Sequence, residues 1–160
     1  MKKTLIVYYS LEGNTEFLAK KLQEKLGADI LKLVPKKDIN KNKVTKYFWG
    51  GKQVFSSKTP ELNDYKVNLE EYEVIIFGTP VWAFTYTPAI KSFIEKQNIK
   101  DKKIAIFCCH EGGKGKVFHK LEKDLLGNVI IGKIDFKNVL KNKEKSLEKL
   151  YDWLEKVELL

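Results

Sequence analysis

The sequence contains no arginine, so all 30 of its basic residues are lysine, and with 21 acidic residues the formal net charge is +9. Bidentate reading of guanine and planar clamping of phosphate both favour arginine. The lysines are scattered through stretches of helical period, where a solvated helix face explains them. We therefore expect no nucleic-acid partner, and the basic surface instead favours acidic partners or anionic small molecules.

Cysteine is scarce as well, because the only two, Cys108 and Cys109, are adjacent. A bridge between them would be a strained vicinal disulfide, so we expect reduced thiols, as in a cytoplasmic protein. His110 and Glu111 follow directly, but consecutive strand residues point to opposite faces, which argues against a shared metal ion. We expect no metal site here.

Long apolar runs are absent too. No stretch approaches the roughly 20 apolar residues that a membrane-spanning helix needs, and the run near the N-terminus is too short for a signal peptide. Only four residues are proline, and no linker rich in glycine or serine divides the chain. We therefore expect one domain over residues 1–160, cytoplasmic, without membrane insertion, as a monomer or weak dimer.

The chain does contain an alternation of strand-like apolar runs and segments of helical period, which is typical of strand-helix-strand units and a parallel sheet. The predicted strands cover residues 5–9, 29–33, 74–77, 104–108 and 129–134. The predicted helices cover residues 15–26, 43–56, 88–97, 116–125 and 143–157. The third and fourth strands are almost continuously apolar, so we expect both of their faces to be buried.

In an open parallel sheet, ligands bind beyond the carboxyl ends of the strands, which directs attention to the loops there. The first such loop leads into a predicted helix and consists of Ser10, Leu11, Glu12, Gly13, Asn14 and Thr15. Backbone N–H groups at a helix N-terminus lack intrahelical partners, and Ser10 and Thr15 add hydroxyl donors, so this loop suits a phosphate group. Ordinary helix capping by Asn14 or Ser10 explains the same residues equally well.

The second loop places large aromatic side chains where loops normally carry small polar residues. It contains Thr79, Pro80, Val81, Trp82, Ala83 and Phe84, with Tyr86 just beyond. Trp82 offers a face on which a flat aromatic ring can stack. Phe84 and Tyr86 fit a ligand contact and a hydrophobic lid over the sheet equally well.

The third loop supplies a glycine-rich wall with titratable groups, and its residues are His110, Glu111, Gly112 and Gly113. An imidazole in this position can tune the charge of a reduced cofactor. The glycines are followed by Lys114 and Lys116, but neither lysine precedes the hydroxyl residue that a Walker motif requires. The sequence therefore argues against a nucleoside triphosphatase.

The motifs Tyr9-Ser10-x-x-Gly13-Asn14-Thr15 and Gly78-Thr79-Pro80-Val81-Trp82 make the sequence resemble the flavodoxin family over essentially its whole length. The resemblance implies an α/β fold: a flavodoxin-like three-layer sandwich, with a five-stranded parallel sheet of order 2-1-3-4-5 and helices on both faces. It also implies FMN as the cofactor. The phosphate is then expected at residues 10–15 and the isoalloxazine between residues 79–84 and 110–113, stacked on Trp82, with no catalytic side chain.

Three departures from the family pattern leave the function open. Many members have a hydroxyl residue where this sequence has Glu12, whose side chain we expect to turn outward. Ala83 or Phe84 replaces a glycine that short-chain carriers often have beside the flavin. The familiar carriers are acidic, whereas this chain is basic, which implies redox partner proteins with acidic patches or small-molecule electron acceptors.

Three functions remain compatible with the sequence. The first is an FMN-binding flavodoxin acting in electron transfer, which the small size and the absence of a second nucleotide site favour. The second is an FMN-dependent NAD(P)H quinone-type reductase, which the aromatic second loop favours. The third is a flavodoxin-like binding domain without redox activity.

Overall fold

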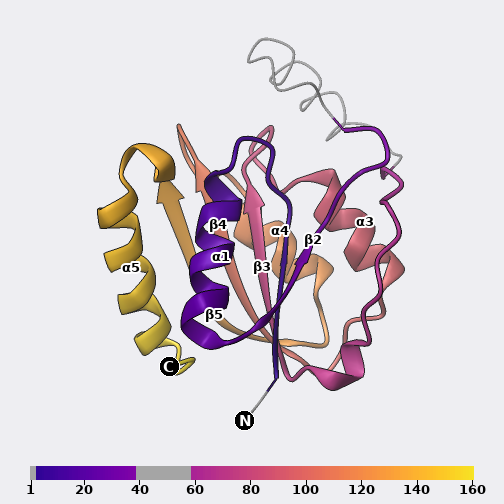
Figure 1. Ribbon diagram of the computed structural model, residues 1–160. Coiled ribbons are helices and arrows are strands. Elements are labelled where there is room, and N and C mark those ends of the chain that lie inside the picture. Colours follow the sequence, from indigo (N-terminus) through magenta and orange to yellow (C-terminus); the bar gives the residue numbers. More distant parts are fainter. Residues whose placement is uncertain (1–2, 39–58) are drawn as a thin grey trace.

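Five parallel strands form one sheet in the order β2-β1-β3-β4-β5 (Figure 1). The computed structural model describes residues 3–38 and 59–160. The strands are β1 (Thr4–Tyr8), β2 (Asp29–Lys32), β3 (Val74–Pro80), β4 (Lys103–His110) and β5 (Val129–Lys137). The predicted fold class and strand order are confirmed.

Helices cover both faces of this sheet, which makes the predicted three-layer sandwich (Figure 1). One face carries α1 (Asn14–Leu26) and α5 (Lys143–Lys156), and the other carries α3 (Pro88–Lys96) and α4 (Val117–Asp124). Two short 3-10 helices are η1 (Leu69–Glu71) and η2 (Val139–Lys141). The helix predicted over residues 43–56 lies outside the described residues. None of the described helices is long and apolar enough to cross a membrane.

The alternation of side chains along the central strands divides the core into two halves. In β4, the residues that pack toward α3 and α4 are Ile104, Ile106 and Cys108, and those that pack toward α1 and α5 are Ala105, Phe107 and Cys109. Successive strand residues point to opposite faces, so a strand covered by helices on both sides must be apolar throughout. The expected burial of both faces of β3 and β4 is confirmed.

The two central strands extend further toward their carboxyl ends than predicted. The apolar pattern placed their ends at residues 77 and 108, but β3 runs to Pro80 and β4 to His110. Backbone pairing continues past the apolar run, because Thr79 pairs with Cys108 and Pro80 with Cys109. Thr79, Pro80 and His110 therefore belong to the strands and not, as predicted, to the loops that follow them.

The absence of a side chain at Gly78 in β3 leaves the space that the Phe107 ring of β4 fills. A Cβ atom at Gly78 would lie 2.2 Å from Cζ of that ring, which is fully buried and has no room to withdraw. We expect Gly78→Ala to lower the free energy of unfolding by about 1–3 kcal/mol, the usual cost of overpacking a core. Urea denaturation measures the change.

Gly112→Ala is the matched control, because a Cβ atom at Gly112 meets no described atom within 4 Å. We expect that variant to stay within about 0.5 kcal/mol of the wild type. Equal stability of the two variants would contradict the packing of Phe107 over β3.

Candidate functional site

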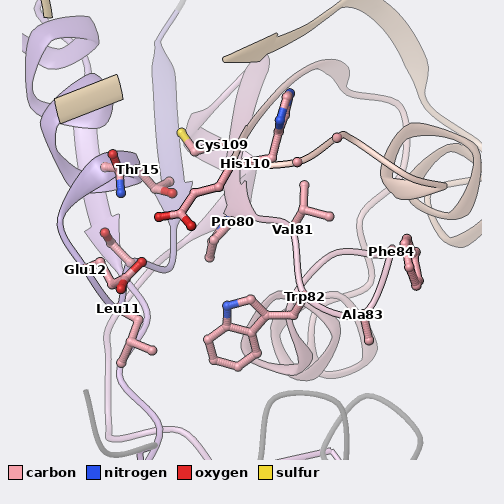
Figure 2. A pocket seen from close by; sticks show the side chains of 15 residues that line it. Leu11, Glu12, Thr15, Pro80, Val81, Trp82, Ala83, Phe84, Cys109 and His110 are labelled. Carbon is pink, nitrogen blue, oxygen red and sulfur yellow. The ribbon is translucent and has the colours of Figure 1, made fainter. Parts of the chain in front are cut away.

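A cavity of about 360 Å³ opens at the carboxyl ends of β1, β3 and β4 (Figure 2). Its volume lies within the range of small-molecule sites. Three segments line it, and their residues are Ser10, Leu11, Glu12, Asn14 and Thr15; Pro80, Val81, Trp82, Ala83 and Phe84; and Cys109, His110, Glu111, Gly112 and Gly113. The structure thus brings together all the residues predicted for the site except Gly13 and Thr79.

Gly13 and Thr79 lie outside the cavity lining. Gly13 precedes α1 with a φ of 98°, a left-handed conformation that favours glycine, and its N–H donates to Ser10 Oγ at 3.2 Å. Thr79 is fully buried, and its hydroxyl donates to the Pro80 carbonyl at 2.8 Å. Because β3 continues through Thr79, this side chain is held inside the protein. Both residues therefore support the lining residues next to them without contacting the cavity themselves.

The first loop carries a buried hydroxyl with no nitrogen or oxygen partner among the described residues. The Thr15 side chain lies in the first turn of α1 and lines the cavity, and the polar group beside its Oγ1 is the weakly hydrogen-bonding thiol of Cys109. The N-cap of α1 is Gly13, which has no side chain with which to cap, and Asn14 Oδ1 accepts from the Leu140 N–H at 3.1 Å. Asn14 therefore does not cap the helix, and the positive end of the helix dipole faces the cavity with the Thr15 hydroxyl beside it.

Cys109 is a lining residue that the sequence did not indicate, because the apolar pattern ended the strand at the preceding residue. Its side chain is buried, and burial raises the pKa of the thiol to about 12, while a weak hydrogen bond with the Thr15 hydroxyl opposes that rise without cancelling it. The thiol is therefore protonated at neutral pH and adds no charge to the cavity.

Trp82 forms the aromatic wall of the cavity and rests against Tyr9. The two ring centroids are 5.2 Å apart and the rings are nearly perpendicular, at 85°. Tyr9 is itself buried, and its hydroxyl donates to Asp38 Oδ1 at 2.7 Å. Burial and this hydrogen bond raise the pKa of Tyr9. Edge-to-face packing of this kind favours one orientation of the Trp82 indole.

Beyond Trp82 the chain reverses in a two-residue turn. Trp82 and Thr85 exchange backbone hydrogen bonds of 2.9 and 3.0 Å, and the residues between them, Ala83 and Phe84, have φ values of 45° and 65°. The Phe84 side chain is 76% exposed at the rim of the cavity. Tyr86 is buried outside the lining and donates a hydrogen bond to Asp124, so it belongs to the core.

His110 pairs with a carboxylate of the neighbouring strand. Its Nε2 lies 2.7 Å from Asp135 Oδ2, and its side chain is only 8% exposed. Its Nδ1 is buried and makes no hydrogen bond among the residues that the structure describes. The ring points away from Trp82 (Figure 2), so the imidazole and the indole occupy opposite ends of the site.

Comparison with known proteins identifies the family. The sequence model described as flavodoxin matches residues 3–157, which is nearly the whole chain. The chain belongs to the flavodoxin family. No curated protein matches its sequence.

Solved structures agree with this flavodoxin fold. A flavoprotein from Lactobacillus acidophilus, in complex with FMN, superposes with a TM-score of 0.74 at 22% identity, covering 91% of this chain and 99% of that one. A Bacteroides eggerthii protein, provisionally described as a flavoprotein, gives 0.81 at 21% identity over 99% of both chains. Oxidised flavodoxin 2 from Bacillus cereus gives 0.60 at 18%, covering 98% and 97%.

The charged residues of the flavodoxin cavity are carboxylates. Glu12 and Glu111 both line it, and both are exposed. Glu12 was expected to turn outward; it is exposed but still forms part of the cavity surface. Within residues 3–38 and 59–160, no group of three or more His, Cys, Asp or Glu side chains is arranged to hold a metal ion. Among the described residues that line the cavity, the groups suited to hold an anion are the backbone N–H groups at the start of α1 and the hydroxyl groups beside them.

The His110–Asp135 pair makes stability depend on pH. Burial tends to raise the pKa of Asp135, but the hydrogen bond from His110 and the nearby charges of Lys149 and Lys114 hold it below its ordinary value of 3.8. The unfolded chain therefore takes up this proton at a higher pH than the folded one. The contribution of Asp135 is fully present above pH 3.8 and is lost as the pH falls through the lower, folded value.

We expect Asp135→Ala to lower the free energy of unfolding at pH 7 by about 1 kcal/mol, a value reduced by the partial exposure of the pair. The deficit should shrink as the pH is lowered below 3.8. Urea denaturation at several pH values measures it, with the exposed residue Asp64, changed to Ala, as the control. A deficit that is constant with pH would contradict a stabilising hydrogen bond from His110 to the ionised Asp135 carboxylate.

Proposed function

We propose that this flavodoxin binds one FMN in the cavity and carries electrons through it. The observation that carries the proposal is that one cavity has a polar end suited to an anion and an aromatic end suited to a flat ring. At one end lies the uncapped N-terminus of α1 with the Thr15 hydroxyl, which has no nitrogen or oxygen partner among the described residues, and at the other lies the Trp82 indole. A ligand that is anionic at one end and flat and aromatic at the other satisfies both.

The residues present fit FMN in detail. Ser10 and Thr15 lie where hydroxyl groups can donate to the phosphate, and Trp82 lies where it can stack on the isoalloxazine. Gly112 and Gly113 form the facing wall and add no side chain that would obstruct the ring. When bound, FMN supplies the redox chemistry, while the protein binds, orients and shields it. The complex of the Lactobacillus acidophilus flavoprotein with FMN supports the choice of ligand.

The carrier hypothesis also predicts the chemistry of the partners. With a net charge of +9, the protein attracts acidic patches on redox proteins or anionic small-molecule acceptors. Lys114 and Lys116 are exposed beside the third loop, close to where a partner would approach the cavity. Association with a protein partner should therefore weaken as salt is added.

A second function, an FMN-dependent NAD(P)H quinone-type reductase, is favoured by the Phe84 ring, which is exposed at the cavity rim where a second flat substrate could contact it. Visible absorption during stepwise anaerobic reduction of the FMN complex separates the two functions. Reduction in two one-electron steps supports the carrier, and a single two-electron step with oxidation of NADH or NADPH supports the reductase. Absence of FMN binding would contradict both.

Thr15→Val tests the phosphate end, because valine keeps the shape of the side chain and removes its hydroxyl. We expect the Kd of FMN to rise about 10- to 15-fold, because a hydrogen bond to a charged group contributes at least about 1.5 kcal/mol. Riboflavin lacks the phosphate, so its Kd should not change. Quenching of flavin fluorescence measures both constants.

Thr4→Val, at the opposite end of β1, is the control for the Thr15 substitution. It should leave the affinities for FMN and riboflavin unchanged. A parallel loss of FMN and riboflavin binding in Thr15→Val would move the phosphate away from this helix.

Trp82→Ala tests the aromatic end. Loss of the stacked indole should raise the Kd of FMN by about 5- to 150-fold, which corresponds to about 1–3 kcal/mol. Riboflavin should be affected equally, since the change concerns the ring. Leu126→Ala, an exposed apolar residue before β5, is the control. An unchanged Kd would remove Trp82 from the binding site.

A further inference from the structure

The second loop is joined to residues 115–116, which follow the third loop, by one hydrogen bond and one very close backbone contact. The Lys116 N–H donates to the Phe84 carbonyl at 2.7 Å. Gly115, with a φ of 54°, lies against the same peptide. A Cβ atom at Gly115 would fall 2.4 Å from the Phe84 oxygen and 2.7 Å from its Cα. The two backbones can approach this closely only because residue 115 has no side chain.

The turn that they hold is unfavourable by itself. Two-residue turns with positive φ at both central positions normally use glycine, asparagine or aspartate there. This turn uses Ala83 and Phe84, and L-residues with a bulky side chain resist the left-handed conformation. Such a conformation persists only where contacts with the surrounding structure hold it in place. Besides the two hydrogen bonds of the turn, the contact from residues 115 and 116 provides that restraint.

We propose that Gly115 is a positioning residue of the cavity: its missing side chain lets residues 115–116 clamp the Phe84 carbonyl and so fixes the turn that carries Trp82. The clamp also holds the exposed Phe84 ring at the rim. It acts through the backbone atoms of Phe84. The expected effect on FMN affinity rests on the proposed function, whereas the clamp itself does not.

Comparing Gly115 with Gly27 separates the loss of the clamp from the backbone strain that any side chain introduces at a positive φ. Gly27, at the C-cap of α1, has a φ of 59°, nearly that of Gly115, but a Cβ atom there meets no described atom within 4 Å. Ala at either position therefore introduces the same left-handed strain, and only Gly115→Ala adds the collision. Asparagine tolerates this conformation better than alanine, so Gly115→Asn and Gly27→Asn repeat the comparison with less strain, should Gly115→Ala fail to fold.

Amide hydrogen exchange of the FMN-free protein, followed by NMR, tests the clamp directly. In the wild type, the amides of Lys116, Trp82 and Thr85 should be protected. In the Gly115 variants, this protection should fall by about tenfold or more, equivalent to about 1.4 kcal/mol, and in the Gly27 variants it should remain. An unprotected Lys116 amide in the wild type would overturn the proposal without any variant.

Flavin titration tests the positioning role. The Gly115 variants should bind FMN and riboflavin about tenfold more weakly than the wild type, equally for both because the ring wall is disturbed. The Gly27 variants should stay within about twofold of the wild type. Equal effects at the two glycines, or a lost clamp with unchanged affinity, would overturn the role of Gly115. If the wild type binds neither flavin, the proposed function fails, and the amide exchange still decides the clamp.

Discussion

The parallel pairing of β3 with β4 continues through Thr79 and Cys108 to Pro80 and Cys109, and the geometry of the cavity depends on it. Parallel strands end at the same edge of a sheet, so this pairing brings the second and third loops face to face. Pairing of β1 with β3 brings the first loop beside them. The buried Thr79 hydroxyl donates a hydrogen bond to the Pro80 carbonyl, which stabilises the carboxyl end of β3.

Backbone conformation and backbone hydrogen bonds determine most of the shape of the cavity at this edge. The first loop presents the start of α1, where Gly13 takes a left-handed conformation and Asn14 bonds elsewhere. The second loop presents Trp82, held by a perpendicular Tyr9 ring and by the turn behind it. A basic chain that lines its cavity with carboxylates thus still offers an anion a favourable helix end. The acidic redox partners of the proposed function would meet the lysines outside the cavity.

Much of this arrangement could be predicted from the sequence, and the remainder depends on contacts that local patterns do not record. The strand order followed from the resemblance to flavodoxins, and the cavity loops from the rule that ligands bind at carboxyl ends of parallel strands. The carboxyl ends of β3 and β4 could not be predicted, because their backbone pairing continues beyond the apolar residues. For the same reason, Cys109 was not predicted to line the cavity. The partner of His110 could not be predicted either, since Asp135 is 25 residues away. The contact of Gly115 with the second loop is likewise visible only in three dimensions.

A titration of the flavin-free protein with FMN, followed by backbone amide shifts, tests the central claim most directly. FMN at the carboxyl edge should shift the amides of residues 10–15, 81–84 and 109–113 together, and with one common Kd. Amides at the opposite end of the sheet, such as those of Leu5 and Val129, should not move. Saturable shifts confined to another surface, or none at millimolar FMN, would contradict the assignment of this cavity as the flavin site.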